Sequence, residues 1–83
     1  RDLMDSDEKV CEDLHALICA EIQGAVVTVN GGGGHYRVTV VSSVFEGLSQ
    51  VVQHRMVYRA INELMKGENP RIHAIDKLET RVS

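Results

Sequence analysis

The residues of this chain best suited to chemistry are two histidines that stand in distinctive surroundings. His35 follows four glycines in the stretch GGGGHY, and His73 lies in the stretch RIHA near the end of the chain. Histidine is a common metal ligand and titrates near neutral pH, so two histidines that met in the fold could bind a metal ion together. A lone histidine is more often a surface or packing residue. The function of the chain therefore depends on whether His35 and His73 come together.

The glycine run before His35 allows three interpretations. A phosphate-binding loop presents N–H groups at the start of a helix, but these glycines lead into a predicted strand and no Lys-Ser/Thr pair follows them. GGGG also matches the GxxG of a KH domain in spelling, although that motif lies between helices. A plain hairpin turn needs only about two loop residues. The remaining interpretation is a flexible loop that carries His35 to a partner, and it stays open beside the hairpin turn.

The two cysteines do not form a known redox or metal motif. Cys11 and Cys19 fall in one predicted helix, where eight residues span about 12 Å, too far for a disulfide. No CxxC pair is present. We interpret both as small, buried or half-buried thiols, which suits a reducing compartment. His15, in the same helix, reads as an ordinary surface residue. Neither a nucleophile with a base nor paired carboxylates are evident, so we do not expect an enzyme.

Five predicted elements must position these side chains. Apolar residues recur at helical spacing before Gly24 and again in QVVQHRMVYRAINELMKG, and HYRVTVVS alternates with the two-residue period of a half-buried strand. The order helix, strand, strand, helix, strand predicts an α+β fold in which helices cover one small, three-stranded mixed sheet. The predicted ranges are 5–24, 25–30, 35–42, 50–67 and 71–79.

Length and composition indicate one small domain over residues 1–83, and we expect residues 1–5 and 79–83 to fray. Hydrophobic residues make up 43% and charged residues 25%, which is ordinary globular composition. No apolar run approaches the roughly 20 residues that a membrane span needs. The net charge is −3, but acidic residues dominate residues 1–24 whereas basic residues outnumber acidic ones in residues 37–71. This basic footprint is weak for a nucleic-acid-binding protein.

Several linked motifs give the sequence a family resemblance. The strand HYRVTVVS, the turn FEG, the helix text QHRMVYRAINEL and the strand RIHA together resemble a BolA-like protein, from about residue 25 to residue 76. The resemblance implies a fold similar to class II KH domains. Where many members have Arg before the His-Arg of the second helix this chain has Gln53, and it ends in LETRVS rather than in Thr-Pro…Trp. Both differences bear on partner contacts.

The resemblance also implies a cofactor and a partner. BolA-like proteins pair with monothiol glutaredoxins and share a bridging 2Fe–2S cluster, to which glutathione contributes on the glutaredoxin side. The histidine of the IHA motif, here His73, is the implied ligand on the BolA side, and His35 is the implied second ligand. Histidine can replace cysteine on one iron of such a cluster, and a cluster needs about four ligands. We therefore expect no cluster in the isolated chain, and weaker assembly in acid because neutral imidazole is the ligating form.

The second helix offers a surface with two interpretations. His54, Arg55 and Arg59 lie on its polar face, which is either a partner-docking surface or a plain solvated face. The alternative function is a nucleic-acid-binding regulator that uses the KH-like fold and a basic patch of Arg55, Arg59, Lys66 and Arg71. The expected location is the cytoplasm or an organellar matrix.

Overall fold

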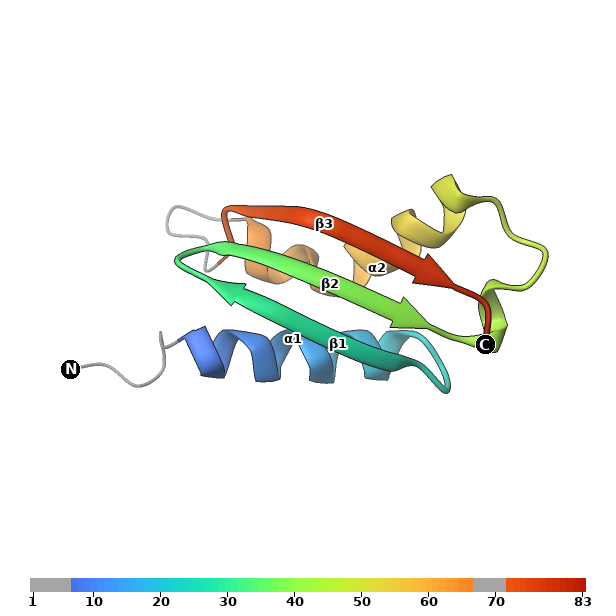
Figure 1. Cartoon of the computed structure of the whole chain (residues 1–83), viewed down its shortest axis with the longest axis horizontal. Coiled ribbons are helices and arrows are strands. Elements are labelled where there is room, and N and C mark those ends of the chain that lie inside the picture. The colour runs from blue at the N-terminus through green and yellow to red at the C-terminus, as the bar shows by residue number, and fades with distance from the viewer. Residues whose placement is uncertain (1–6, 67–71) are drawn as a thin grey trace.

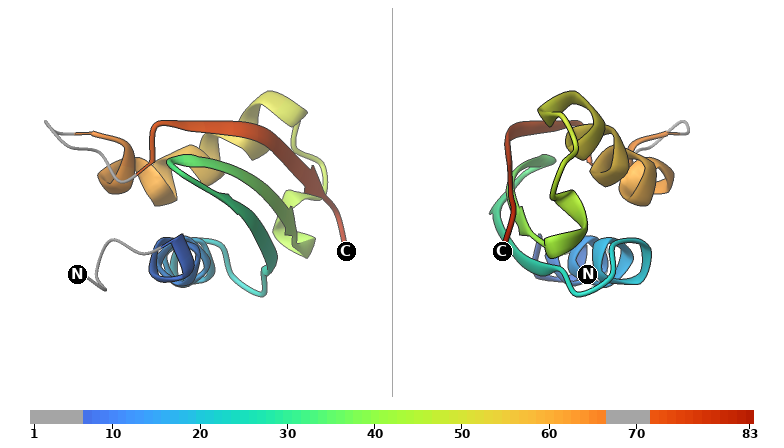
Figure 2. Two further views of the ribbon diagram at one scale, coloured as in Figure 1. Left: turned by 60° about the vertical axis from the view of Figure 1, so that its left-hand side comes forward. Right: turned by 90° about the vertical axis from the view of Figure 1, so that its right-hand side faces the viewer.

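The computed structural model describes residues 7–66 and 72–83, which form two helices packed on one face of a three-stranded sheet (Figures 1 and 2). The strand order is β1-β2-β3, with β1 antiparallel and β3 parallel to β2. This arrangement confirms the predicted α+β class and element order. The elements are α1 (Asp7–Glu21), β1 (Val26–Gly32), β2 (His35–Val41), the 3-10 turn η2 (Ser43–Phe45), α2 (Gln50–Met65) and β3 (Ala74–Arg81).

The helix α1 packs through one stripe of apolar side chains. Val10, Leu14 and Ile18 are buried at intervals of four residues, which places them on one helix face. The first turn carries Asp7 and Glu8, and negative charge there is favourable because a helix N-terminus is the positive end of its dipole. No helix in residues 7–66 and 72–83 is long and apolar enough to cross a membrane.

The strands β1 and β2 form a tight hairpin rather than a long flexible loop. Gly32 pairs with His35, so only Gly33 and Gly34 form the turn. Both have positive φ, at 64° and 87°, as a type I′ turn requires and as glycine allows at low cost. The first two glycines of the run belong to β1. The glycine run is therefore a plain hairpin turn, and His35 is the first residue of a strand.

The helix α2 crosses from the end of β2 to the start of β3. The Ser49 hydroxyl caps it by accepting the N–H of Val52 at 3.3 Å. Val57, Ile61 and Leu64 are buried against the sheet and α1. Because this crossover returns the chain in the direction of β2, β3 lies parallel to β2, and the chain reaches the end of the sheet where β2 began (Figure 1).

The tail corrects one expectation of the sequence. Residues 79–81, expected to fray, continue β3 opposite the last three residues of β2. The Thr80 hydroxyl donates a hydrogen bond to Gln53 Oε1 at 2.6 Å, and the backbone carbonyl of Arg81 accepts one from the N–H of Ser42 at 3.0 Å. Gln53 is itself buried and donates to the carbonyls of Phe45 and Leu48, so it stabilises the fold instead of facing a partner. Residues 1–5 lie outside the described residues.

Candidate metal centre

The structure brings His35 and His73 together at one end of the sheet. Their ring centroids are 6.4 Å apart and the ring planes are inclined by 17°. Both side chains are exposed, and that of His35 keeps 57% of its surface open. His35 points to solvent rather than into the core because Tyr36, the next residue of β2, takes the buried position. His73 was predicted on the last strand, but it lies one residue before β3 begins.

Gly34 holds the segment of His73 in place. Its carbonyl oxygen accepts the N–H of His73 at 2.7 Å and the N–H of Ala74 at 3.1 Å. A Cβ atom at Gly34 would overlap Cδ2 of the His73 ring, so a side chain there would force the ring or the turn to shift. The imidazole of His73 therefore packs against the turn at the point where only glycine leaves room for it.

The side chain of Asp7 links the start of α1 to the same turn by hydrogen bonds. Its Oδ1 accepts the N–H of Gly33 at 3.0 Å and the hydroxyl of Tyr36 at 3.4 Å. Burial of Tyr36, together with the charge and hydrogen bond of Asp7, raises the pKa of its phenol. Gly32 also packs against this carboxylate, since a Cβ there would lie 2.5 Å from Asp7 Oδ2. The hairpin tip that carries His35 is thus held by α1 as well as by β3.

Asp76 lies beside His35 because of an irregularity in β3. Tyr36 pairs with Ile75 and Arg37 pairs with Lys77, so Asp76 is an extra residue without a partner position on β2. Such a β-bulge redirects the side chain of the extra residue. Here the Asp76 Oδ1 atom is 3.2 Å from His35 Nδ1, within hydrogen-bond distance.

The arrangement of His35 and His73 places two exposed imidazoles side by side, where solvent or a partner can reach them. No group of three or more metal-binding side chains gathers within residues 7–66 and 72–83. Two exposed imidazoles fit half of the ligand set of a 2Fe–2S cluster, which takes about four protein ligands. A metal centre built here would take its other ligands from outside the described residues.

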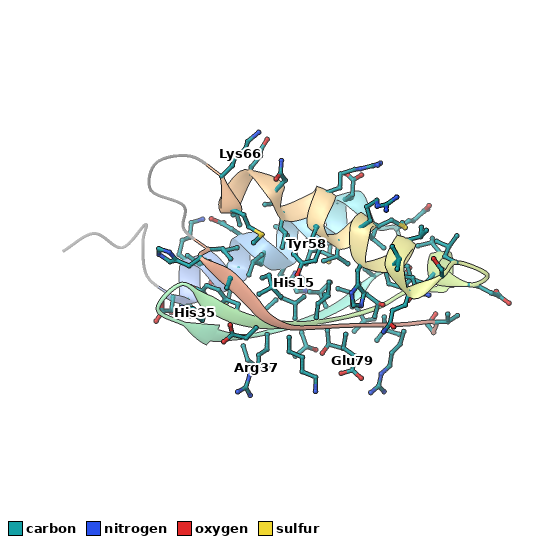
Figure 3. All side chains as sticks on the ribbon, turned by 90° about the horizontal axis from the view of Figure 1, so that it is seen from above. His15, His35, Arg37, Tyr58, Lys66 and Glu79 are labelled. Carbon is teal, nitrogen blue, oxygen red and sulfur yellow. The ribbon has the colours of Figure 1, made fainter. Side chains whose placement is uncertain are left out.

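The basic side chains on α2 and after its end lie mostly as the sequence indicated. Arg55, Arg59 and Lys66 are exposed, and Lys66 is at the same end of the molecule as His35 (Figure 3). His54 is only half-exposed, and its Nε2 is buried with no hydrogen-bond partner among the described residues. Arg71 lies outside the described residues. The exposed polar face of α2 is thus formed more by its arginines than by His54.

A second group of metal-binding side chain types lies on α1. Cys19 Sγ is 3.8 Å from His15 Nδ1, one helical turn away. An open groove between α1 and β1 is lined by Glu8, Cys11, Glu12, His15 and Val29. Burial, followed by the charge of Asp7, raises the pKa of the Cys11 thiol, which makes it a poorer nucleophile at neutral pH. Both cysteines are free and half-buried, as predicted.

Sequence reasoning missed the side chains that support the histidine pair. Asp7 and Asp76 carried no motif, and Gly34 was one glycine among four.

The two-residue period of β2 places Arg37 on the uncovered face of the sheet, where Figure 3 shows it pointing away from the helices. Its register partner Lys77 lies on the same face. A bulge cannot be read from a single strand, because it is defined by the pairing with the neighbouring strand.

Comparisons with known proteins agree with this fold. The family model of BolA-like protein matches residues 13–81. BolA-like protein 1 of Bos taurus is 47% identical over 45 residues, which cover 54% of this chain and 31% of that protein. The matched stretch is thus less than a third of that relative.

Two solved structures superpose over most of the chain. A bolA protein homologue from Coxiella burnetii is 29% identical with a TM-score of 0.70, covering 86% of this chain and 87% of the other. BolA1 from Mus musculus is 31% identical with a TM-score of 0.68, covering 88% of this chain and 64% of the other. The similarity therefore extends over both helices and the sheet.

Proposed function

The chain belongs to the BolA-like protein family, and from this premise we propose that it is an iron–sulfur adaptor rather than an enzyme. It binds a monothiol glutaredoxin and shares with it a bridging 2Fe–2S cluster, in cluster trafficking or in iron and redox regulation. The cluster is a cargo held between two proteins. Free Cys11 and Cys19 suit a reducing compartment, the cytoplasm or an organellar matrix.

The observation that carries the proposal is the meeting of His35 and His73. His35 begins β2 directly after the hairpin turn, and His73 lies just before β3. The fold places these two exposed imidazoles with their centroids 6.4 Å apart. A cluster needs about four ligands, so two histidines leave the remaining positions to the glutaredoxin cysteine and glutathione. Histidine ligation raises the reduction potential of a 2Fe–2S centre, which suits a cluster that is passed on.

Neighbouring residues of this chain hold the two histidines in position for binding. The backbone of Gly34 fixes the segment of His73 through two hydrogen bonds, and Asp7 fixes the turn before His35. A pair held in this way loses little side-chain and loop entropy when it binds, so more of the interaction energy appears as affinity.

The outer face of α2 provides the docking surface in this proposal. Val51, Arg55, Tyr58 and Arg59 recur at helical spacing and are exposed, with 65% of Val51 and 39% of Tyr58 open to solvent. Tyrosine and arginine are enriched where proteins bind one another. The charge-reversing change Arg55→Glu with Arg59→Glu should weaken binding of a cluster-free glutaredoxin by about tenfold or more, measured by calorimetry.

The test of ligation is cluster reconstitution with a monothiol glutaredoxin and glutathione, followed by visible circular dichroism. Wild-type chain should change the spectrum of the glutaredoxin cluster. His73→Ala should abolish that change and His35→Ala should reduce or abolish it, because each removes one of two ligands.

The matched control is His15→Ala, which removes an exposed histidine of α1 and should behave as wild type. The proposal fails if wild type forms no mixed cluster, or if His15→Ala is as damaging as His73→Ala.

The second candidate is a nucleic-acid-binding regulator, and the exposure of Arg55 and Arg59 on α2 and of Lys66 directly after it supports it. The glycine run does not, since it forms a strand turn rather than a helix-borne GxxG. Binding of a DNA duplex across a salt series tests this candidate. Phosphate contacts release counterions, so affinity should fall steeply with salt. Loss of that binding in Arg55→Glu would support this role.

A further inference from the structure

We propose that Asp76 is a positioning residue for His35, which it holds with Nδ1–H directed at the carboxylate and Nε2 directed outward as the metal-binding atom. The inference rests on the proposed function, since it names the atom that His35 would offer to the shared cluster. Three observations carry it: the bulge in β3, the contact between Asp76 and His35, and the stacking of His35 beside His73.

The bulge places Asp76 where a regular strand would not. In a regular ladder Asp76 would pair with Arg37, and Lys77 would fall opposite Val38 on the buried face. The extra residue moves Lys77 opposite Arg37 and Leu78 opposite Val38. The core pattern is thereby kept, and Asp76 is left unpaired on the exposed side, next to the first residue of β2.

The contact with Asp76 selects one nitrogen of His35. A carboxylate only accepts hydrogen bonds, so a hydrogen bond across the 3.2 Å between Asp76 Oδ1 and His35 Nδ1 requires the proton on Nδ1. In neutral imidazole the other nitrogen, Nε2, then keeps the free lone pair that a metal requires. Metal-binding histidines commonly donate their second ring nitrogen to a carboxylate in this way, which fixes both the tautomer and the ring orientation.

The geometry of the two rings agrees with a fixed orientation. The two ring planes are inclined by only 17° and the centroids are 6.4 Å apart, so the imidazoles are stacked beside one another. The side chain of Asp76 is itself 52% exposed and His35 57% exposed, so the pair lies at the surface where a partner protein can approach. An exposed histidine without such a contact would sample several rotamers, and ordering it on binding would reduce affinity.

The experiment compares wild type with Asp76→Ala and Asp76→Asn. Long-range ¹H–¹⁵N correlation spectra of the cluster-free chain, at a pH where imidazole is neutral, report which nitrogen of His35 carries the proton. We expect the Nδ1–H form in wild type and in Asp76→Asn, whose amide oxygen can still accept, and a shift toward Nε2–H in Asp76→Ala. Glu21→Gln, which changes an exposed carboxylate at the far end of α1, is the matched control and should leave His35 as in wild type.

The same variants are then loaded with cluster together with glutaredoxin and glutathione. The lifetime of the mixed cluster should fall about tenfold or more in Asp76→Ala, as is typical when a carboxylate behind a metal-binding histidine is removed. Asp76→Asn should retain most of the wild-type cluster lifetime. An unchanged His35 tautomer in Asp76→Ala, or an unchanged cluster lifetime, would overturn the role of Asp76 alone. If wild type forms no mixed cluster, the proposed function fails and the ligand role of His35 fails with it.

Discussion

Two regions of this molecule bring metal-binding side chain types together, and they do so in different ways. His15 and Cys19 are neighbours on α1, one turn apart, with Cys19 Sγ 3.8 Å from His15 Nδ1. His35 and His73 are far apart in sequence and meet because β2 and β3 are parallel neighbours in the sheet. The first pair depends on one helix, and the second depends on the whole fold.

The difference lies in what holds each pair. The carbonyl of Gly34 accepts hydrogen bonds from the backbone at His73. The carboxylate of Asp76 contacts the ring of His35. His15 has only its contact with Cys19 among the interactions of the described residues. A ligand pair is useful to a binding partner when its orientation is fixed before binding, because ordering it later reduces affinity. The histidine pair of the sheet meets this condition better than the pair on α1.

The change with the largest expected effect is Gly34→Val, which puts a side chain into the space of the His73 ring. The positive φ of Gly34 and the overlap of the added side chain with the His73 ring should together lower the free energy of unfolding by about 2–4 kcal/mol. The mixed cluster should be lost as well. Urea unfolding measures the first effect and circular dichroism the second.

Gly33→Asn is the control for that experiment. Nothing lies within 4 Å of a Cβ at Gly33, and Asn-Gly is a favoured type I′ turn. This variant should stay within about 0.5 kcal/mol of wild type. Equal losses in the two variants would contradict the packing of His73 against Gly34.

The next change, Asp7→Ala, tests whether α1 supports the sheet site. It removes acceptors for the Gly33 N–H and the Tyr36 hydroxyl, so the free energy of unfolding should fall by about 1–2 kcal/mol. Glu8→Ala changes the adjacent acid, which lacks these contacts, and should lower the free energy of unfolding by only about 0.3 kcal/mol. Thermal unfolding of the two variants would separate them, and matching midpoints would argue against a role for Asp7.

A titration of Tyr36 sharpens the same contact. Its folded-state pKa is raised above the ordinary value of about 10 by burial and by Asp7, so the stability it contributes is complete below pH about 10 and is lost as pH rises through the folded pKa. Asp7→Asn should lower that pKa. The near-ultraviolet absorbance of tyrosinate measures it in a Tyr58→Phe background, where Tyr36 is the only tyrosine. A pKa unaffected by Asp7→Asn would show that Asp7 does not contribute to the shift.

The smallest expected effect belongs to the pair on α1. His15→Ala combined with Cys19→Ser should change the free energy of unfolding by less than about 1 kcal/mol, because both side chains are partly exposed. Mixed cluster formation should remain as in wild type. A loss of cluster in this double variant would reverse the comparison and make α1 the functional site.

The fold was largely predictable because its signals are local. The helical spacing of Val10, Leu14 and Ile18, and the two-residue period of Tyr36, Val38 and Val40, each follow from which face of an element is buried. The tail was mispredicted because its stability comes from elsewhere. Thr80 is held by Gln53 of α2, a contact between residues 27 apart in sequence.

Of the candidate site, only the two histidines could be picked out from the sequence. His35 and His73 stood out through the BolA-like resemblance. The residues that hold them did not stand out, because the role of each comes from a partner in another segment. Gly34 matters through the ring of His73, and Asp7 through the turn of the hairpin.

The sequence by itself determined the elements, their order, and the two histidines that could act as ligands. Periodicity and turn chemistry act over a few residues, so they can be read along the chain. Only the tertiary structure decided that His35 faces solvent beside His73 and that a bulge directs Asp76 toward it. Strand register and side-chain packing arise between distant segments, and they exist only once the sheet has formed.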